Sequence, residues 1–344
     1  MRISRAAASI LATFALAASI RAADTGRYKV VQTLRVGGDG GWDYLTVDPA
    51  ARRLYVTRGT RVMVFDADTL AAVGEIPNTA GVHGVALAPD LGRGFASDGK
   101  AASVTIFDLK TLKPIEDVKV TGENPDAILY DPFSKQVYAF NGRTANATVL
   151  DASSGKVKAT VALGGKPEFA TTDLAGRIFV NIEDKSEVVV LDAGKNEVAA
   201  RWPLAPCEEP SGMAIDRAKD RLFVGCDNKM MAVVDVKSGK VAATIPIGGG
   251  VDANGFDSTT GTAFSSNGEG NLTVAREGAD GHFVAESVPT MRGARTMALD
   301  EKTHRVFLAT AEFGPPPSPT PEQPHPRPSM VPGSFTLLVV APAP

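Results

Sequence analysis

The sequence predicts an all-β protein, a seven-bladed β-propeller built from four-stranded antiparallel blades. From Trp42 onward, an aromatic residue in an apolar strand recurs every 40 to 44 residues, and no helical period is sustained outside the N-terminus. A repeat of this length made of short strands is typical of a propeller blade, which buries its faces only against neighbouring blades. The seven recurring aromatics are Tyr55, Phe95, Tyr138, Phe179, Phe223, Phe264 and Phe307.

Each copy contains a second apolar strand that ends in Asp, followed by a turn. In the turn, Asp accepts local backbone N–H bonds and Gly supplies a positive φ. A further short apolar strand, as at 157–161 and 241–245, completes four strands in a copy. Two copies depart from the Asp-ended strand: the sixth has Arg276 in place of the Asp, and the seventh keeps only the apolar part of the strand. The Asp-ended strands lie at 62–66, 104–108, 147–151, 188–192 and 231–235.

The two ends of the repeat array complement each other. The last copy lacks a fourth strand, because only four residues follow Val340, whereas residues 28–36 form an apolar strand without a blade of its own. Pairing the two would remove the exposed sheet edge of an open array. We therefore expect the N-terminal strand to close the ring, and the 34 Gly and 23 Pro residues suit a fold made of turns.

Residues 1–23 have the composition of a secretory signal peptide. Arg2 and Arg5 precede an apolar run at 6–20, and small residues at 17–23 supply a cleavage region. The alternative is a membrane anchor, although the apolar run is shorter than the ~20 residues that span a bilayer. We expect a periplasmic or secreted, monomeric protein whose residues 24–344 form the propeller.

The charge disfavours a nucleic-acid partner. The whole chain carries a formal net charge of −3. Removal of Arg2 and Arg5, with or without Arg21, changes this charge to −5 or −6. A mildly acidic protein is a poor match to a phosphate backbone.

The two cysteines predict a structural disulfide. Cys207 lies in the loop that leads into the fifth copy, and Cys226 lies at the end of the following strand, so both should reach the same face of the blade. Export to an oxidising compartment permits the bond. The alternatives are a metal site or redox chemistry, but two thiolates without a nearby His make an incomplete zinc site.

The repeat resembles a known family. Asp48-Pro49 followed by Tyr55-Val56, and Asp131-Pro132 followed by Tyr138, are similar to the frame of the YncE-like exported bacterial proteins with YVTN β-propeller repeats, and residues 54–57 read Leu-Tyr-Val-Thr. The resemblance covers essentially the whole mature chain. It implies an exported seven-bladed propeller, and it carries over no catalytic motif.

A ring of polar residues is expected at one mouth of the central channel. The first strand of a blade lines the channel, and in six copies a polar or charged residue lies five positions before the turn Asp that follows this strand. In the second copy, which has Ala88 in place of this Asp, aligning Pro89 with Pro49 gives His83 as the matching residue. The seven positions are Asp43, His83, Asp126, Glu168, Ser211, Asp252 and Arg295. Trp42 lies beside the first of them and could stack on a ligand or pack under the closing strand.

Two interpretations of this ring stay open. Polar groups in a water-filled channel are solvated and need no ligand. Alternatively, Asp43, Asp126, Glu168 and Asp252 hold Ca²⁺, Mg²⁺ or a cationic ligand, with His83 as a general base. No cofactor is otherwise indicated.

For function, the sequence favours a non-catalytic protein that binds a small molecule or a protein partner at this mouth. The second candidate is a divalent-metal-dependent hydrolase or lyase resembling the propeller lactonases, with the metal on the axis. The sequence contains no motif for covalent haem, no nucleophile elbow, no phosphate loop and no His-Glu-x-x-His.

Two segments depart from the strand pattern. Residues 314–332 of the last copy contain nine prolines and should be extended polyproline II, placed over the channel mouth as a cover, as a docking strip or as a tolerated loop. Glu312, Glu322, His325 and Arg327 carry the chemically active side chains of this region. Residues 37–41, Gly-Gly-Asp-Gly-Gly, are expected to be a flexible loop that binds no cation.

Overall fold

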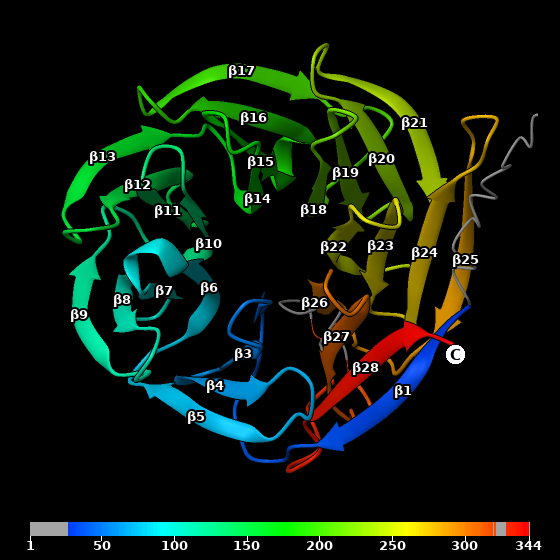
Figure 1. Ribbon diagram of the computed structural model, residues 1–344, viewed down its shortest axis with the longest axis horizontal. Helices are drawn as coiled ribbons and strands as arrows, with labels where there is room; N and C mark the ends of the chain where they lie inside the picture. The colour runs from blue at the N-terminus through cyan, green and yellow to red at the C-terminus, as the bar shows by residue number, and fades with distance from the viewer. Residues whose placement is uncertain (1–26, 319, 321–327, 344) are drawn as a thin grey trace, which may run out of the picture.

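The computed structural model describes residues 27–318, 320 and 328–343. Seven four-stranded antiparallel sheets stand around a central channel like the blades of a propeller (Figure 1). Each of the first six blades uses four consecutive strands, and the seventh combines strands from both ends of the chain. The predicted fold class is therefore confirmed.

The innermost strand of each blade faces the channel. These strands are β2 (Leu45–Asp48), β6 (Val82–Ala88), β10 (Pro125–Asp131), β14 (Pro167–Thr172), β18 (Pro210–Asp216), β22 (Val251–Asp257) and β26 (Thr296–Asp300). The second strands carry the recurring aromatics and are β3 (Arg53–Arg58), β7 (Arg93–Asp98), β11 (Gln136–Asn141), β15 (Arg177–Ile182), β19 (Arg221–Cys226), β23 (Thr262–Asn267) and β27 (Arg305–Thr310).

The two outer strands complete each blade. The third strands are β4 (Arg61–Asp66), β8 (Ser103–Asp108), β12 (Asn146–Asp151), β16 (Glu187–Asp192), β20 (Met230–Asp235), β24 (Asn271–Glu277) and β28 (Thr336–Pro342). The outermost strands of the first six blades are β5 (Ala72–Pro77), β9 (Pro114–Lys119), β13 (Val157–Ala162), β17 (Glu197–Pro203), β21 (Lys240–Pro246) and β25 (Phe283–Pro289). Two single turns of 3₁₀-helix, η1 (Pro89–Leu91) and η2 (Glu183–Lys185), interrupt this pattern.

The N-terminal strand closes the ring, as the sequence predicts. Strand β1 (Tyr28–Arg35) lies antiparallel to β28, with Lys29 opposite Ala341 and Arg35 opposite Thr336. Figure 1 shows the blue β1 alongside the red β28 on the outer rim. This pairing gives the last blade its fourth strand, so the array has no open edge at the seam.

The hydrophobic core lies between the blades. All seven recurring aromatics have relative exposures of 0 or 1%. Phe223, for example, stacks on Phe256 of the next blade with ring centroids 5.1 Å apart. Burying such rings contributes stability only when the neighbouring blade is present, which explains why the repeat folds as a closed array.

The Asp-led turns have the predicted chemistry. The Oδ1 atom of Asp151 accepts backbone N–H bonds from Ser153 at 3.1 Å and from Ser154 at 2.8 Å. Gly155 follows with φ of 73°, a conformation that a side chain disfavours. The Ser153 hydroxyl, which donates to the same oxygen at 2.6 Å, and these backbone bonds hold the pKa of Asp151 down to about 2, so the turn carboxylate stays charged.

The glycine loop at 37–41 is anchored, contrary to the expectation of a flexible loop. The buried guanidinium of Arg58 donates to the carbonyl oxygens of Gly37 and Gly38 at 3.2 and 3.1 Å, and also to that of Gly40. It lies 3.9 Å above the ring of Phe335. The guanidinium therefore fixes the loop and joins the first blade to the seam.

Cys207 and Cys226 form a disulfide, as predicted, with their Cα atoms 5.5 Å apart. Both residues are buried in the apolar cluster between the fourth and fifth blades. Such a bond persists in oxidising compartments. The predicted signal peptide at 1–23 lies outside the described residues, and no helix within the described ranges is long and apolar enough to cross a membrane.

Only the two ends of the proline-rich segment can be described. Phe313 and Met330 form an antiparallel bridge, and Gly314 N–H donates to the Ser329 carbonyl at 2.9 Å. The two ends of the segment are therefore hydrogen-bonded to each other like antiparallel strands. The sequence predicts polyproline II, which has no such bonds, for the whole segment. Glu322, His325 and Arg327 lie outside the described residues.

Deleting residues 24–36 should open the ring. The loss of β1 exposes the edge of β28, so we expect aggregation or a fall in melting temperature on the order of 10 °C or more. Circular dichroism and light scattering would measure both effects. Deleting only residues 24–26 leaves β1 intact and is the control. A soluble 24–36 deletion with unchanged melting would contradict the role of β1.

Replacing both Cys207 and Cys226 with Ser should lower the free energy of unfolding by about 2–4 kcal/mol, because the open chain gains conformational freedom. Urea denaturation would measure the change. Non-reducing mass spectrometry of the unmodified protein should yield the linked peptide pair, and two free thiols in exported material would contradict the bond.

Candidate functional site at the channel mouth

The seven predicted polar positions lie at one end of the channel. Five of these positions are the second residues of their inner strands, namely His83, Asp126, Glu168, Ser211 and Asp252. Asp43 lies two residues before β2, and Arg295 lies one residue before β26. Because the inner strands stand side by side around the axis, equivalent positions form one ring. The closed fold thus places the polar groups of seven blades at the same level.

Hydrogen bonds between neighbouring blades fix the backbone of this ring. In each case a group on one blade donates to the main-chain carbonyl of a ring residue on the next blade. The pairs are Tyr44 N–H to His83 at 3.1 Å, Ser97 hydroxyl to Asp126 at 2.5 Å, Asn181 amide to Ser211 at 2.7 Å, and Ser266 hydroxyl to Arg295. Such support preorganises the side chains that the ring residues direct toward the channel.

The tightest group in the ring is formed by Asp43, His83 and Asp126. His83 Nδ1 lies 2.7 Å from an Asp43 carboxylate oxygen and 3.6 Å from one of Asp126. One potential ligand atom from each residue lies within 4.8 Å of the others. Burial alone would lower the pKa of His83, but the hydrogen bond to Asp43 and the nearby Asp126 raise it to about 9. At neutral pH the imidazolium is therefore the cation between these two carboxylates.

Gly99 sets the position of the imidazole. A Cβ atom at this position would lie 2.6 Å from His83 Nε2, so only a residue without a side chain leaves room for the ring. The Nδ1 atom consequently faces the two carboxylates. The sequence gives no indication of this contact, because it depends on how two neighbouring loops approach each other.

Glu168 extends the acidic group toward the fourth blade. Its carboxylate lies 2.9 Å from the ammonium of Lys166, which also pairs with Glu183. Burial, together with the charge of Asp126, raises the pKa of Glu168 to about 8, and the Lys166 contact offsets only part of this effect. Burial likewise raises the pKa of Asp126 to about 6. The mouth therefore holds more carboxyl groups than it can ionise together at neutral pH.

On the side of the sixth and seventh blades, the ring contains a carboxylate paired with an arginine. Asp252 pairs with the Nε of Arg295 at 3.2 Å, and the Ser211 hydroxyl lies 3.4 Å from the same carboxylate. The predicted ring is thus assembled, but its four carboxylates do not gather in one cluster. Asp43 and Asp126 share His83, Glu168 pairs with Lys166, and Asp252 pairs with Arg295.

Two aromatic rings that the sequence analysis missed span the channel beneath the acidic groups. Tyr44 of the first blade and Phe169 of the fourth lie with ring centroids 5.5 Å apart. Burial and the carboxylates above it, led by Asp126, raise the pKa of Tyr44 well above its ordinary value. The sequence offered one signal for these rings, the size of the residue that follows each ring position. In the other five blades that residue is small, namely Gly84, Ala127, Gly212, Ala253 and Thr296.

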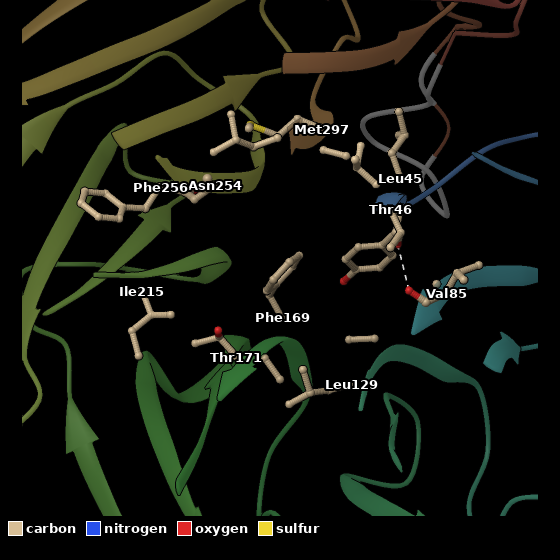
Figure 2. Close-up of a pocket in the computed structure, with 18 of the residues that line it drawn as sticks. Leu45, Thr46, Val85, Leu129, Phe169, Thr171, Ile215, Asn254, Phe256 and Met297 are labelled. Atoms are coloured by element: carbon tan, nitrogen blue, oxygen red, sulfur yellow. Dashed lines mark hydrogen bonds between the residues drawn. The ribbon is translucent and has the colours of Figure 1, made fainter. Parts of the chain in front are cut away.

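The same two rings line a cavity of about 350 Å³ in the channel. Figure 2 shows Phe169 near its centre, with Thr46 and Ile215 on either side. Many of its lining residues are apolar, but Asn254, Arg217 and Glu301 also line it, whereas none of the seven mouth residues does. Tyr44 and Phe169 lie between the polar mouth and this cavity, and we refer to the pair as the aromatic floor of the mouth.

Trp42 adopts the packing role that the sequence analysis left open. Its ring lies 5.2 Å from Phe335 and 6.2 Å from Phe313, measured between ring centroids. Trp42 is half-buried and, together with Arg295, lines a cavity beside the mouth. The residue is both a packing element of the seam and part of the mouth surface.

Behind His83, two carboxyl groups share one hydroxyl. The Thr105 hydroxyl oxygen lies 2.5 Å from an oxygen of buried Asp98 and 2.7 Å from one of exposed Asp117. One hydroxyl proton cannot serve both carboxylates, so one carboxyl group must itself donate. Burial, reinforced by Asp117, raises the pKa of Asp98 to about 7, which identifies Asp98 as the protonated partner.

No protein-family model and no curated protein matches the chain.

Replacing Asp98 with Asn should stabilise the protein at alkaline pH. The folded pKa of about 7 lies above the ordinary value, so the folded state binds more protons than the unfolded state between pH 4 and 7. The wild type therefore loses stability as pH rises through this window. Asn keeps a donor for Thr105 without ionising, and we expect a gain on the order of 2 kcal/mol at pH 8 and none at pH 4.

Urea denaturation of both proteins at several pH values would measure this gain. Asp117→Asn is the control, because it removes one charge but leaves the buried carboxyl group in place. Parallel stability profiles for wild type and Asp98→Asn would show that Asp98 does not carry the proton.

Proposed function

We propose that this protein is an exported, monomeric β-propeller of the YncE-like type that binds a small cationic ligand at the channel mouth without catalysing a reaction. The observation that carries the proposal is the crowding of Asp43, Asp126 and Glu168 next to the aromatic floor. A bound cation would stabilise the ionised forms of Asp126 and Glu168, whose pKa values burial raises. The disulfide supports a periplasmic or secreted location.

The aromatic floor favours an organic cation. Tyr44 and Phe169 lie directly below the carboxyl groups, and rings of this kind attract ammonium groups through their faces. A ligand at the mouth would therefore contact polar side chains around it and aromatic rings beneath it. Such a combination is common in small-molecule sites.

Replacing Asp126, Glu168 and Asp252 with Asn, Gln and Asn should weaken binding of a cation by at least about tenfold, because each loses a charge-assisted contact. Choline and Ca²⁺ are suitable probes in isothermal titration calorimetry. The wild-type affinity should rise between pH 6 and 9 as Asp126, Glu168 and His83 lose their protons.

The control is the triple variant Asp39→Asn, Glu123→Gln and Asp227→Asn, which removes the same charge from exposed residues outside the ring. It should bind like the wild type. Equal affinity in both triple variants, or no binding of either probe by the wild type, would contradict a cation site at the mouth.

A divalent-metal-dependent hydrolase or lyase is the second candidate, and the grouping of Asp43, His83 and Asp126 favours it. These residues offer one nitrogen and two carboxylate oxygens to an ion, leaving further coordination positions for water and substrate. Ca²⁺ or Mg²⁺ would suit the carboxylates, whereas a nitrogen ligand suits Zn²⁺ as well. Binding requires His83 to release its proton.

Elemental analysis of the purified protein separates the two functions. A stoichiometric divalent metal that is lost in His83→Gln would favour the enzyme, and lactones would then be the first substrates to assay. Absence of such a metal, together with choline binding, would favour the non-catalytic protein.

A further inference from the structure

A second cavity, of about 470 Å³, lies beside the ring on the side of the sixth and seventh blades. Several parts of the chain enclose it: the approach to β2, two loops of the sixth blade, the loop before β26, and the ends of the proline-rich segment. Its lining residues are Gly41, Trp42, Gly250, Gly268, Arg292, Gly293, Arg295, Thr296, Phe313, Pro328 and Met330.

One wall of this cavity is flat and apolar. Trp42 contributes an indole ring that Phe335 and Phe313 hold in place. Phe313 in turn is fixed by its bridge to Met330, which also lines the cavity. Because these rings are already packed, a flat ligand could stack on the wall without first ordering it.

Another side of the cavity is formed by the backbone of three glycines. Gly268 N–H donates to the Gly250 carbonyl at 2.8 Å, and Gly293 N–H donates to the Gly268 carbonyl at 2.8 Å. Gly293 has φ of 80°, and a Cβ atom there would lie 2.5 Å from Phe313. A side chain at this position would displace Phe313, so glycine allows the backbone to pack against the ring at one edge of the cavity. The slot is the space that remains beside this contact.

Two cationic side chains border the slot. Arg295 pairs with Asp252. The guanidinium of Arg292 is exposed and forms no hydrogen bond or ion pair with the part of the chain that the structure describes. A guanidinium presents paired N–H donors that match a carboxylate. Arg292 is thus an available anion-binding group next to an aromatic wall.

We propose that this cavity binds a small aromatic carboxylate, with its ring against Trp42 and its carboxylate on Arg292. The combination of an apolar wall with a guanidinium that has no partner among the described residues selects for that class. This site is distinct from the proposed cation site, since none of the acidic residues Asp43, Asp126 and Glu168 lines it.

The probe is 2-naphthoate, and its neutral analogue is 2-naphthylmethanol. Isothermal titration calorimetry should show that the wild type binds naphthoate at least about tenfold more tightly than the alcohol. Arg292→Gln should remove this preference and leave binding of the alcohol unchanged. The matched control is Arg143→Gln, an exposed arginine on the loop between the second and third strands of the third blade, which should bind both probes like the wild type.

Gly41→Leu should block the cavity for both probes. A Cβ atom at Gly41 would meet no heavy atom within 4 Å, and the backbone there is not left-handed, so the new side chain can extend into the slot without displacing the protein. Circular dichroism would verify the fold of this variant. If the variant were unfolded, the comparison of Arg292→Gln with Arg143→Gln would still test whether Arg292 binds the carboxylate.

The pair Asp126→Asn and Glu168→Gln separates this site from the cation site. Together these substitutions should abolish choline binding and leave naphthoate binding unchanged. Failure of the wild type to bind naphthoate, equal affinity in Arg292→Gln, or loss of naphthoate binding in the Asp126 and Glu168 variant would each overturn the proposal.

Discussion

The pairing of β1 with β28 is the constraint on which the other features depend. Every blade buries its aromatic residue against a neighbour, so an unclosed array would leave two terminal faces and a free strand edge exposed. Closure also fixes the diameter of the channel and therefore the distances among ring residues from different blades. Arg58 reinforces the seam from the first blade, since its guanidinium holds the glycine loop and stacks on Phe335.

The mouth illustrates how a repeat can produce chemical variety. One structural position recurs in all seven blades, yet its side chain is a carboxylate in four and His, Ser or Arg in the others. The backbone at this level is held by equivalent bonds between blades, so a change of side chain alters charge without altering the scaffold. Local partners then divide the ring into an acidic half around His83 and a mixed half around Arg295.

The fold could be predicted because its signals are periodic. The recurring aromatics, the Asp-led turns and the unpaired strands at both ends each have a direct structural meaning, and the disulfide followed from antiparallel neighbours. The ring positions could be aligned by counting from the turn Asp. Their pairing could not, because Lys166 and Gly99 act through loops whose conformation no repeat specifies.

The contact between Tyr44 and Phe169 narrows the channel just inside the ring of polar residues. Each ring comes from a different blade, so a solute moving along the axis at this level must pass two large side chains instead of the Gly, Ala and Thr residues of the other blades. The width of the passage is therefore set by side-chain size at two positions and not by the number of blades. A single substitution there would change the permeability of the channel without changing the architecture of the ring.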